Sequence, residues 1–273
     1  MESKNLQIVN NGNLSYILFP KLSACGAVKH AFSTRLGGVS EGECSSMNLS
    51  FNRNDSRENV LENYKILCSA VGINTENLVL SRQTHTNNVI SVTNEHRGTG
   101  VTLPSFSDVD GLITNTPNVA LVTQYADCTP LLFCDPVSRV IATSHAGWRG
   151  TAKEIGRVTV EKMVREYGCK PENIIAAIGP CIGKCCYEVD EPVFNEFSKI
   201  PYLKLNKIFT DKGNAHYMLD LVEANRQILI EAGISPDNID LSDICTCCNS
   251  DTLHSHRATG GKRGNLAAII QLK

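Results

Sequence analysis

The sequence predicts an α+β fold: a single domain, residues 1–273, with a mixed β-sheet core flanked by helices. Short apolar runs and longer segments of helical periodicity follow one another without regular alternation, so a repeated βαβ pattern is not indicated. The 273 residues, 42 % hydrophobic and 20 % charged, suffice for one large core. No Pro/Ser-rich linker, charge block or internal repeat divides the chain.

The individual elements follow from hydrophobic spacing and from capping residues. Apolar runs predict strands at 17–19, 27–32, 77–83, 88–92, 112–115, 119–125, 131–133, 139–142, 173–178 and 266–272. Helical periodicity predicts helices at 57–71, 151–167, 191–199 and 219–232. Ser56 is placed to cap the start of the first helix, and Gly72 and Gly168 are placed to end the first and second.

Asp135 and Pro136 lie between the runs 131–133 and 139–142, and this pattern predicts a β-hairpin. A hairpin returns the chain beside its start. Cys128, before the first strand, and His145, after the second, should therefore face each other. His85, at the end of another predicted strand, joins them if it converges on the same place.

His85, Cys128 and His145 allow two kinds of chemistry. Two imidazoles and one thiolate form a three-ligand set that suits Zn²⁺ with an open fourth position, as in catalytic zinc sites. Without a metal, Cys128 becomes a nucleophile, His145 its base, and Asp127 or Gln83 the orienting group. The residues alone leave both interpretations open.

Two arginines are candidates for binding an anion. The glycines of the stretch 145–150 let the chain turn from a strand into a helix, whose N-terminus attracts negative charge. Arg149 lies at this helix start. Arg35 precedes the Gly37-Gly38 turn, where anion binding and a surface salt bridge are equally expected.

The acidic pair of Asp108 and Asp110 precedes a predicted strand, and turn capping is favoured over cation binding there. A net charge of -2 without a basic stripe indicates neither nucleic acid nor an anionic membrane as a partner. The start of the chain lacks the apolar core of a signal peptide, and no apolar run approaches the ~18 residues of a membrane span. A cytoplasmic protein is therefore expected.

Twelve cysteines in such a chain favour buried thiols, metal ligation or catalysis over disulfides. Six of them form two clusters, Cys181, Cys185 and Cys186 with Cys245, Cys247 and Cys248. Such paired segments can make a closed zinc site, although C-x-C-C is not a common spacing. Buried thiols in tight loops are the favoured interpretation.

Five motifs together resemble a known family. They are FSTR-x-GGVS at 32–40, QTH at 83–85, ADCTP at 126–130, HAGWRG at 145–150 and IGPCIG at 178–183. This series is similar to that of the purine nucleoside phosphorylase family formerly described as laccase-like polyphenol oxidases, the YfiH/PgeF-like proteins. The likeness runs in order from about residue 30 to the C-terminus.

The resemblance implies a YfiH-like fold related to cysteine hydrolases, with zinc ligands that match His85, Cys128 and His145. It further implies phosphorolysis of adenosine, inosine and S-methyl-5′-thioadenosine, with adenosine deaminase activity alongside. Nucleoside and phosphate would then be the small-molecule partners. Arg149, with Arg35 as second choice, would bind the phosphate, and Asp127 would carry a proton.

Three alternatives accompany this expectation. One is a metal-free cysteine hydrolase or amidase that uses Cys128 and His145 to edit cell-wall precursors. Another is a metal-binding or regulatory protein without turnover. Copper-dependent polyphenol oxidation is also attributed to the family, but three N/S ligands do not resemble a multicopper centre. His254 and His256 stand where the family has aromatic residues, and both are expected to be exposed on a loop.

Overall fold

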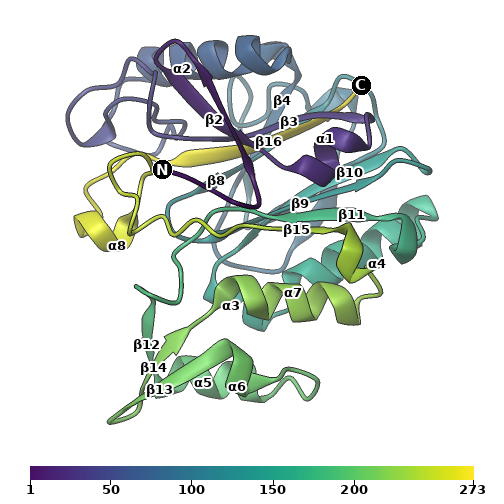
Figure 1. Cartoon of the computed structure of the whole chain (residues 1–273). Coiled ribbons are helices and arrows are strands. Elements are labelled where there is room, and N and C mark those ends of the chain that lie inside the picture. The colour runs from purple at the N-terminus through teal and green to yellow at the C-terminus, as the bar shows by residue number, and fades with distance from the viewer.

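A computed structural model describes residues 1–273 and shows stacked layers of helix and sheet (Figure 1). The helices are α1 (Pro20–Ala24), α2 (Arg57–Val71), α3 (Trp148–Ala152), α4 (Ile155–Tyr167), α5 (Glu191–Ser198), α6 (Leu205–Ile208), α7 (Leu221–Glu231) and α8 (His256–Thr259). The strands are β1 (Gln7–Asn11), β2 (Leu14–Leu18), β3 (Val28–Ser33), β4 (Leu78–Arg82), β5 (Val89–Ser91), β6 (Phe106–Ser107), β7 (Gly111–Thr114), β8 (Ala120–Tyr125), β9 (Thr129–Asp135), β10 (Val140–Ala146), β11 (Ile175–Ile178), β12 (Glu188–Asp190), β13 (Phe209–Gly213), β14 (His216–Leu219), β15 (Ile239–Leu241) and β16 (Leu266–Leu272).

Two mixed sheets stack face to face between layers of helix. The first sheet has the order β1-β2-β3-β16-β8-β4-β6, and the second has the order β15-β11-β9-β10-β7-β5. Helix α2 covers the outer face of the first sheet, and α4 and α7 cover the outer face of the second. The predicted class, a mixed β core flanked by helices, is confirmed. The division of the strands between two sheets was not evident from their sequence.

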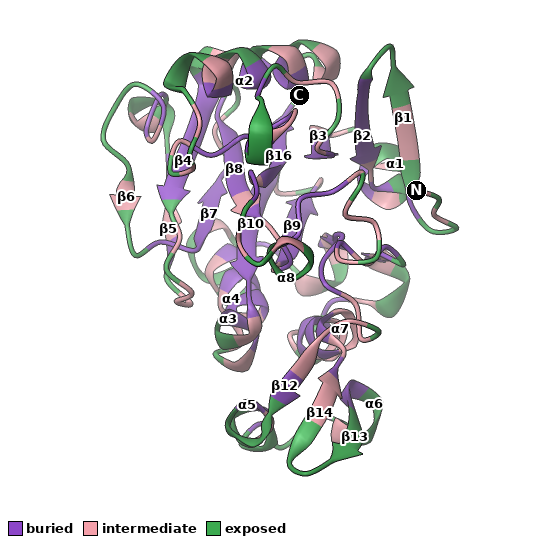
Figure 2. Cartoon of the chain, turned by 90° about the vertical axis from the view of Figure 1, so that its left-hand side faces the viewer, coloured by how far each residue is buried: buried purple, intermediate pink, exposed green.

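Apolar side chains fill the spaces between the layers. Phe32 and Leu121 from the first sheet meet Leu132 and Ile141 from the second in one buried cluster. Central strands such as β8, β9 and β10 are therefore covered on both faces, as Figure 2 shows by their purple colour. Burial on both faces explains why apolar and polar residues do not alternate regularly along these strands; buried polar residues such as Thr123 and Thr143 are hydrogen-bonded to each other.

The helices lie close to the bounds predicted from hydrophobic spacing and capping residues, with one exception. Helix α2 has the predicted bounds: the Ser56 side chain accepts the Asn59 N–H, and Gly72 ends the helix in the left-handed region. The predicted helix 151–167 is two helices, because Glu154 adopts a φ of 55° that interrupts the helix between α3 and α4. The helix that begins after Gly147 is thus only five residues long. Its dipole is correspondingly weaker than that of the helix we predicted.

A small third sheet, β12-β14-β13, lies with α5 and α6 at the bottom of Figure 1. It has its own apolar cluster, in which Phe194 stacks on Tyr217 with 4.5 Å between ring centroids. The segment is inserted between β11 and α7, and the chain enters it through Tyr187. None of the helices has the length and apolar composition that crossing a membrane requires.

Candidate functional site

The β9–β10 hairpin places the thiol beside one imidazole. Pro130 pairs with His145, so Cys128 precedes β9 at the end of the hairpin where His145 and Gly147 lie. The chain reaches Cys128 from β8, and residues 126–128 therefore cross from the first sheet to the second. His85 follows β4 of the first sheet. The ligand atoms of His85, Cys128 and His145 lie within 4.8 Å of one another.

Asp110 holds both histidines, and it is fully buried. Its carboxylate accepts the backbone N–H groups of Thr84, His85 and Thr86 at 3.1, 3.0 and 2.8 Å. These bonds hold His85 in the left-handed region, with a φ of 66°. The same carboxylate accepts a hydrogen bond from Nδ1 of His145 at 2.8 Å. Nε2 of His145 is then the ring nitrogen left for chemistry.

The charges of these groups depend on one another. Burial raises the pKa of the Cys128 thiol, but the imidazoles of His145 and His85 outweigh burial and lower this pKa to about 6. Burial lowers the pKa of His145, but Cys128 and Asp110 outweigh it and raise this pKa to about 9. Burial likewise opposes ionisation of Asp110, yet hydrogen bonds from His145 and Thr86 hold its pKa at about 2. Without a metal, the site at neutral pH is a thiolate–imidazolium pair beside a carboxylate.

The donors also fit a metal ion. Sγ of Cys128 lies 3.8 Å from Nε2 of His85, a spacing close to that of two ligands on one zinc ion. Gly147 leaves the space between them open, since a Cβ there would lie 2.8 Å from the His85 ring and 3.0 Å from Sγ of Cys128. The Asp110–His145 bond is the kind that orients a metal-binding imidazole. One thiolate and two imidazoles leave a fourth position free.

A cavity of about 820 Å³ opens over the three donors, and its wall is rich in arginine. The arginines that line it are Arg53, Arg82, Arg149, Arg257 and Arg263. None of them forms a salt bridge with a carboxylate; the salt bridges of arginine in this chain belong to Arg157, Arg165 and Arg226. The cavity therefore carries positive charge that no acidic side chain neutralises at contact distance.

The two predicted anion-binding arginines differ in their placement. Arg149 lines the cavity, with its guanidinium 4.3 Å from the ring centroid of Trp148. Arg35 does not line the cavity. Its guanidinium donates to the carbonyls of Ser45 and Ser250 at 2.8–2.9 Å, so it binds two backbone segments together instead of forming a surface salt bridge.

The predicted orienting groups have other partners. Asp127 lines the cavity, but its carboxylate accepts hydrogen bonds from the Thr246 hydroxyl and from the backbone N–H of Arg257, both at 2.6 Å. The Gln83 side chain pairs with the backbone of Gln124 at 2.7 and 2.9 Å. The group that orients His145 is Asp110.

Asp110 was missed because capping of its own turn was favoured, whereas it binds the backbone of a different loop. No sequence signal indicated this role, because it depends on the pairing of β7 with β10, which places Gly111 opposite Ser144. Arg53, Arg257 and Arg263 were also missed. They come from loops or from the four-residue helix α8, where no hydrophobic spacing indicates which side chain faces inward.

His254 and His256 have different environments. His256 is exposed, as expected, and lies at the cavity wall. The expectation of exposure is wrong for His254, which is fully buried with both ring nitrogens unpartnered. Burial, with Arg35 and Arg263 nearby, lowers the pKa of His254 to about 3, so it is neutral. Its ring therefore fills core space.

The fold and site define a class of protein: mixed sheets stacked between helices, with a Cys–His₂ centre at the ends of the strands. The chain matches the crystal structure of Bacillus licheniformis hypothetical protein YfiH with a TM-score of 0.93 at 33 % identity, covering 99 % of this chain and 100 % of that one. It matches YlmD from Geobacillus stearothermophilus with a TM-score of 0.91 at 31 % identity, covering 97 % and 98 %.

Sequence comparison agrees with the structural match. The family model described as multi-copper polyphenol oxidoreductase laccase matches residues 29–273. Purine nucleoside phosphorylase YlmD of Bacillus subtilis is 35 % identical over 244 residues, covering 89 % of this chain and 87 % of that protein. Purine nucleoside phosphorylase of Deinococcus radiodurans is 38 % identical over 246 residues, covering 90 % of each. The chain belongs to this family, that of the purine nucleoside phosphorylase YlmD.

Proposed function

We propose that the chain is a purine nucleoside phosphorylase that cleaves adenosine, inosine and S-methyl-5′-thioadenosine, and that it also deaminates adenosine. The names of its relatives support the first activity. One observation on this chain carries the proposal: arginines without acidic partners and a thiol–imidazole centre face the same cavity of about 820 Å³. This volume is typical of sites for small molecules of nucleoside size.

Phosphorolysis requires a bound phosphate whose oxygen attacks the ribose carbon as the bond to the base breaks. Arg149 is our candidate for holding this phosphate, because its guanidinium lines the cavity without a carboxylate partner. Arg53 and Arg263 supply a second cationic edge, joined through the Asn265 side chain, to which both donate. Nε of Arg263 is buried and has no partner.

The broken glycosidic bond leaves its electron pair on the base, which must gain a proton. We assign the relay of this proton to Asp127, which lines the cavity beside Cys128: its carboxylate would take the proton that the attacking hydrogen phosphate loses and pass it to the base. Each of its oxygens accepts one hydrogen bond and keeps a second lone pair. Trp148 and Tyr187 line the same wall, where a planar base could pack against the ring surface that Arg149 and Arg257 leave uncovered.

His85, Cys128 and His145 would hold zinc in this site. When bound, zinc supplies a water of lowered pKa, ~7, which suits attack on C6 of adenine during deamination. Asp110 keeps Nδ1 of His145 bonded and the His85 loop in place. The chain's own contribution is therefore a preorganised donor set in a buried position.

A second candidate function rests on the Cys128–His145–Asp110 series. Asp110 orients His145, and the thiol pKa of about 6 gives a thiolate at neutral pH. These are the parts of a metal-free cysteine hydrolase or amidase. Its activity would survive chelators and be lost on treatment with iodoacetamide.

The deciding experiment measures base release from the three nucleosides with and without phosphate, on protein of known metal content. Arg149→Ala should raise the KM for phosphate roughly tenfold or more, because a charge-assisted hydrogen bond is worth about 1.5–3 kcal/mol. Adenosine deamination should change much less. Arg157→Ala, a surface arginine paired with Glu154 and Glu161, is the matched control.

Equal loss of both activities in Arg149→Ala would refute the phosphate assignment. His85→Ala should lose zinc and activity together. If the parent protein holds no zinc and consumes no nucleoside, the phosphorylase proposal fails. Amide substrates should then be screened against Cys128→Ser.

A further inference from the structure

The topology brings the two cysteine clusters together. Strands β11 and β15 are parallel neighbours, with Ile178 opposite Leu241. The loops that follow them leave the same edge of the sheet. A further bridge pairs Cys181 with Cys245, and the Thr246 N–H donates to the Cys181 carbonyl at 2.9 Å. Sequence-distant cysteines therefore meet in space.

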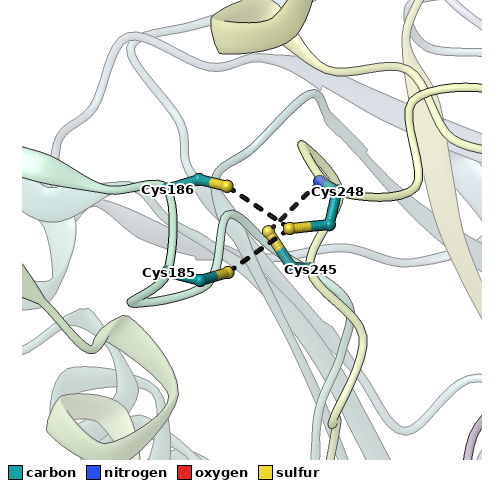
Figure 3. A group of neighbouring side chains, drawn as sticks. All are labelled: Cys185, Cys186, Cys245 and Cys248. Atoms are coloured by element: carbon teal, nitrogen blue, oxygen red, sulfur yellow. Dashed lines mark hydrogen bonds between the residues drawn. The ribbon is translucent and has the colours of Figure 1, made fainter.

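Four of these cysteines point toward one centre, as Figure 3 shows. Their Sγ atoms lie within 4.8 Å of one another, and the residues are Cys185, Cys186, Cys245 and Cys248. Sγ of Cys248 lies 3.5 Å from that of Cys185 and 3.4 Å from that of Cys186. Cys185 and Cys248 are exposed, so the interpretation as buried thiols in tight loops is wrong for them.

Backbone N–H groups around this group donate hydrogen bonds to one of its sulfur atoms. The N–H groups of Gly183 and Cys248 donate to Sγ of Cys245 at 3.1 and 3.5 Å. A side chain at Gly183 would crowd this group, because its Cβ would lie 3.0 Å from Cβ of Cys245 and 3.3 Å from Sγ of Cys185. The Gly183 carbonyl accepts the N–H groups of Cys186 and Tyr187, which closes a tight turn.

We propose that Cys185, Cys186, Cys245 and Cys248 bind one structural zinc ion, separate from the centre at His85, Cys128 and His145. Zinc–thiolate bonds of about 2.3 Å in a tetrahedron place the sulfurs about 3.8 Å apart, which fits the observed spacing. Four ligands close the site, as in structural zinc sites. An iron–sulfur cluster binds four cysteines through two or four iron atoms instead of one and would spread the sulfurs further.

A disulfide fits the geometry less well. Its sulfurs would have to approach from 3.4 Å to about 2.05 Å, and two of the four thiols would be left without a role. Positive charge near the group also favours a complex of four thiolates with one divalent ion. Arg257 donates to the Cys186 carbonyl at 3.1 Å, and Lys184 directly precedes Cys185 in the chain.

The zinc site would join the two loops behind the wall of the cavity. Thr246, inside the Cys245–Cys248 turn, donates to Asp127 at 2.6 Å. On the other loop, Cys186 precedes Tyr187, over whose ring the Arg257 guanidinium lies at 5.4 Å. All three of Asp127, Tyr187 and Arg257 line the cavity. The ion therefore fixes wall residues without touching the substrate.

The test is metal content by mass spectrometry on the full chain. Cys185→Ser and Cys248→Ser should each lose one equivalent of zinc relative to the parent. Cys247→Ser is the matched control, because Cys247 lies in the same turn but outside the group, and it should keep all its metal. His85→Ala should remove a different equivalent, and the losses should add in His85→Ala/Cys248→Ser.

Cobalt gives a second measurement. Co²⁺ bound by four thiolates has strong visible and charge-transfer absorption, which should vanish in Cys185→Ser and persist in His85→Ala and Cys247→Ser. Equal zinc in Cys185→Ser, Cys248→Ser and the parent would overturn the proposal. So would iron in place of zinc, or a disulfide to Cys248 in the natively purified protein. These results do not depend on nucleoside turnover, so failure here is distinct from failure of the proposed function.

Discussion

Asp110→Asn tests whether a buried carboxylate organises the His85–Cys128–His145 centre. The carboxylate accepts five hydrogen bonds: from the N–H groups of Thr84, His85 and Thr86, the Thr86 hydroxyl and Nδ1 of His145. Asparagine keeps the shape, removes the charge, and turns an NH₂ group toward groups that are themselves donors.

The expected cost has two parts. The pKa of Asp110 is about 2, against an ordinary value of ~3.9, and this difference corresponds to about 2.5 kcal/mol of folding free energy at neutral pH. An unsatisfied buried donor adds about 1–3 kcal/mol. We therefore expect Asp110→Asn to lower the free energy of unfolding at neutral pH by about 3.5–5.5 kcal/mol, measured by urea unfolding with a chelator present.

The stability difference between the parent protein and Asp110→Asn should also depend on pH, in a direction that follows from the pKa of Asp110. A carboxyl group whose folded pKa is depressed contributes stability that is present above its unfolded pKa and lost as pH falls toward its folded pKa. The difference between parent and variant should therefore shrink as pH falls from ~5 toward ~2. Zinc affinity at neutral pH, from competition with a chromogenic chelator, should fall about 10–100-fold.

Asp108→Asn is the control, because Asp108 is an exposed neighbour that bonds to the Thr84 side chain. It should change the free energy of unfolding by less than about 1 kcal/mol. An Asp110→Asn protein as stable as this control, or a stability difference that grows in acid, would refute the reasoning.

Three further predictions concern single residues. Gly147→Ala should weaken zinc binding at least about tenfold in a chelator titration, because its Cβ would lie 2.8 Å from His85 and 3.0 Å from Cys128; unchanged affinity would contradict this geometry. In metal-depleted protein, alkylation of Cys128, followed by peptide mapping, should rise with pH around a midpoint of about 6; a midpoint near ~8.5, the value of an ordinary thiol, would exclude the thiolate–imidazolium pair. His254→Phe should reduce the fall in Tm between about pH 6.5 and pH 3, since the buried, unpartnered ring has a folded pKa of about 3, below its unfolded value, and gives stability that is lost as pH falls through this range; an unchanged Tm profile would show that His254 does not control acid stability.

The sequence predicted best what depends on local pattern. The hairpin of β9 and β10 was evident from two apolar runs around a turn, and it brought Cys128 and His145 together. Helix α2 was predicted with its caps because Ser56 and Gly72 act within one turn of the helix ends. The break at Glu154 was missed, since an acidic residue in the left-handed region has no distinctive sequence signal.

What depends on sheet topology was not predictable. Asp110 and the four-cysteine group both arise from pairings between strands far apart in sequence, β7 with β10 and β11 with β15. Alternation within a strand indicates which face is buried, but it does not indicate which strand lies alongside. His254 was misjudged because residues near it in sequence suggested a loop, whereas the ring is buried and Gly264 packs closely against it.

The register of the β9–β10 hairpin limits how this family can diverge. Because side chains alternate along a strand, inserting or deleting one residue within 129–135 or 140–146 would turn one partner of the Cys128–His145 pair to the opposite face. Insertions in the turn at 136–139 leave every pair in place. Length variation among descendants of this chain should therefore collect in that turn, while the two strands keep their lengths even where their apolar residues are exchanged.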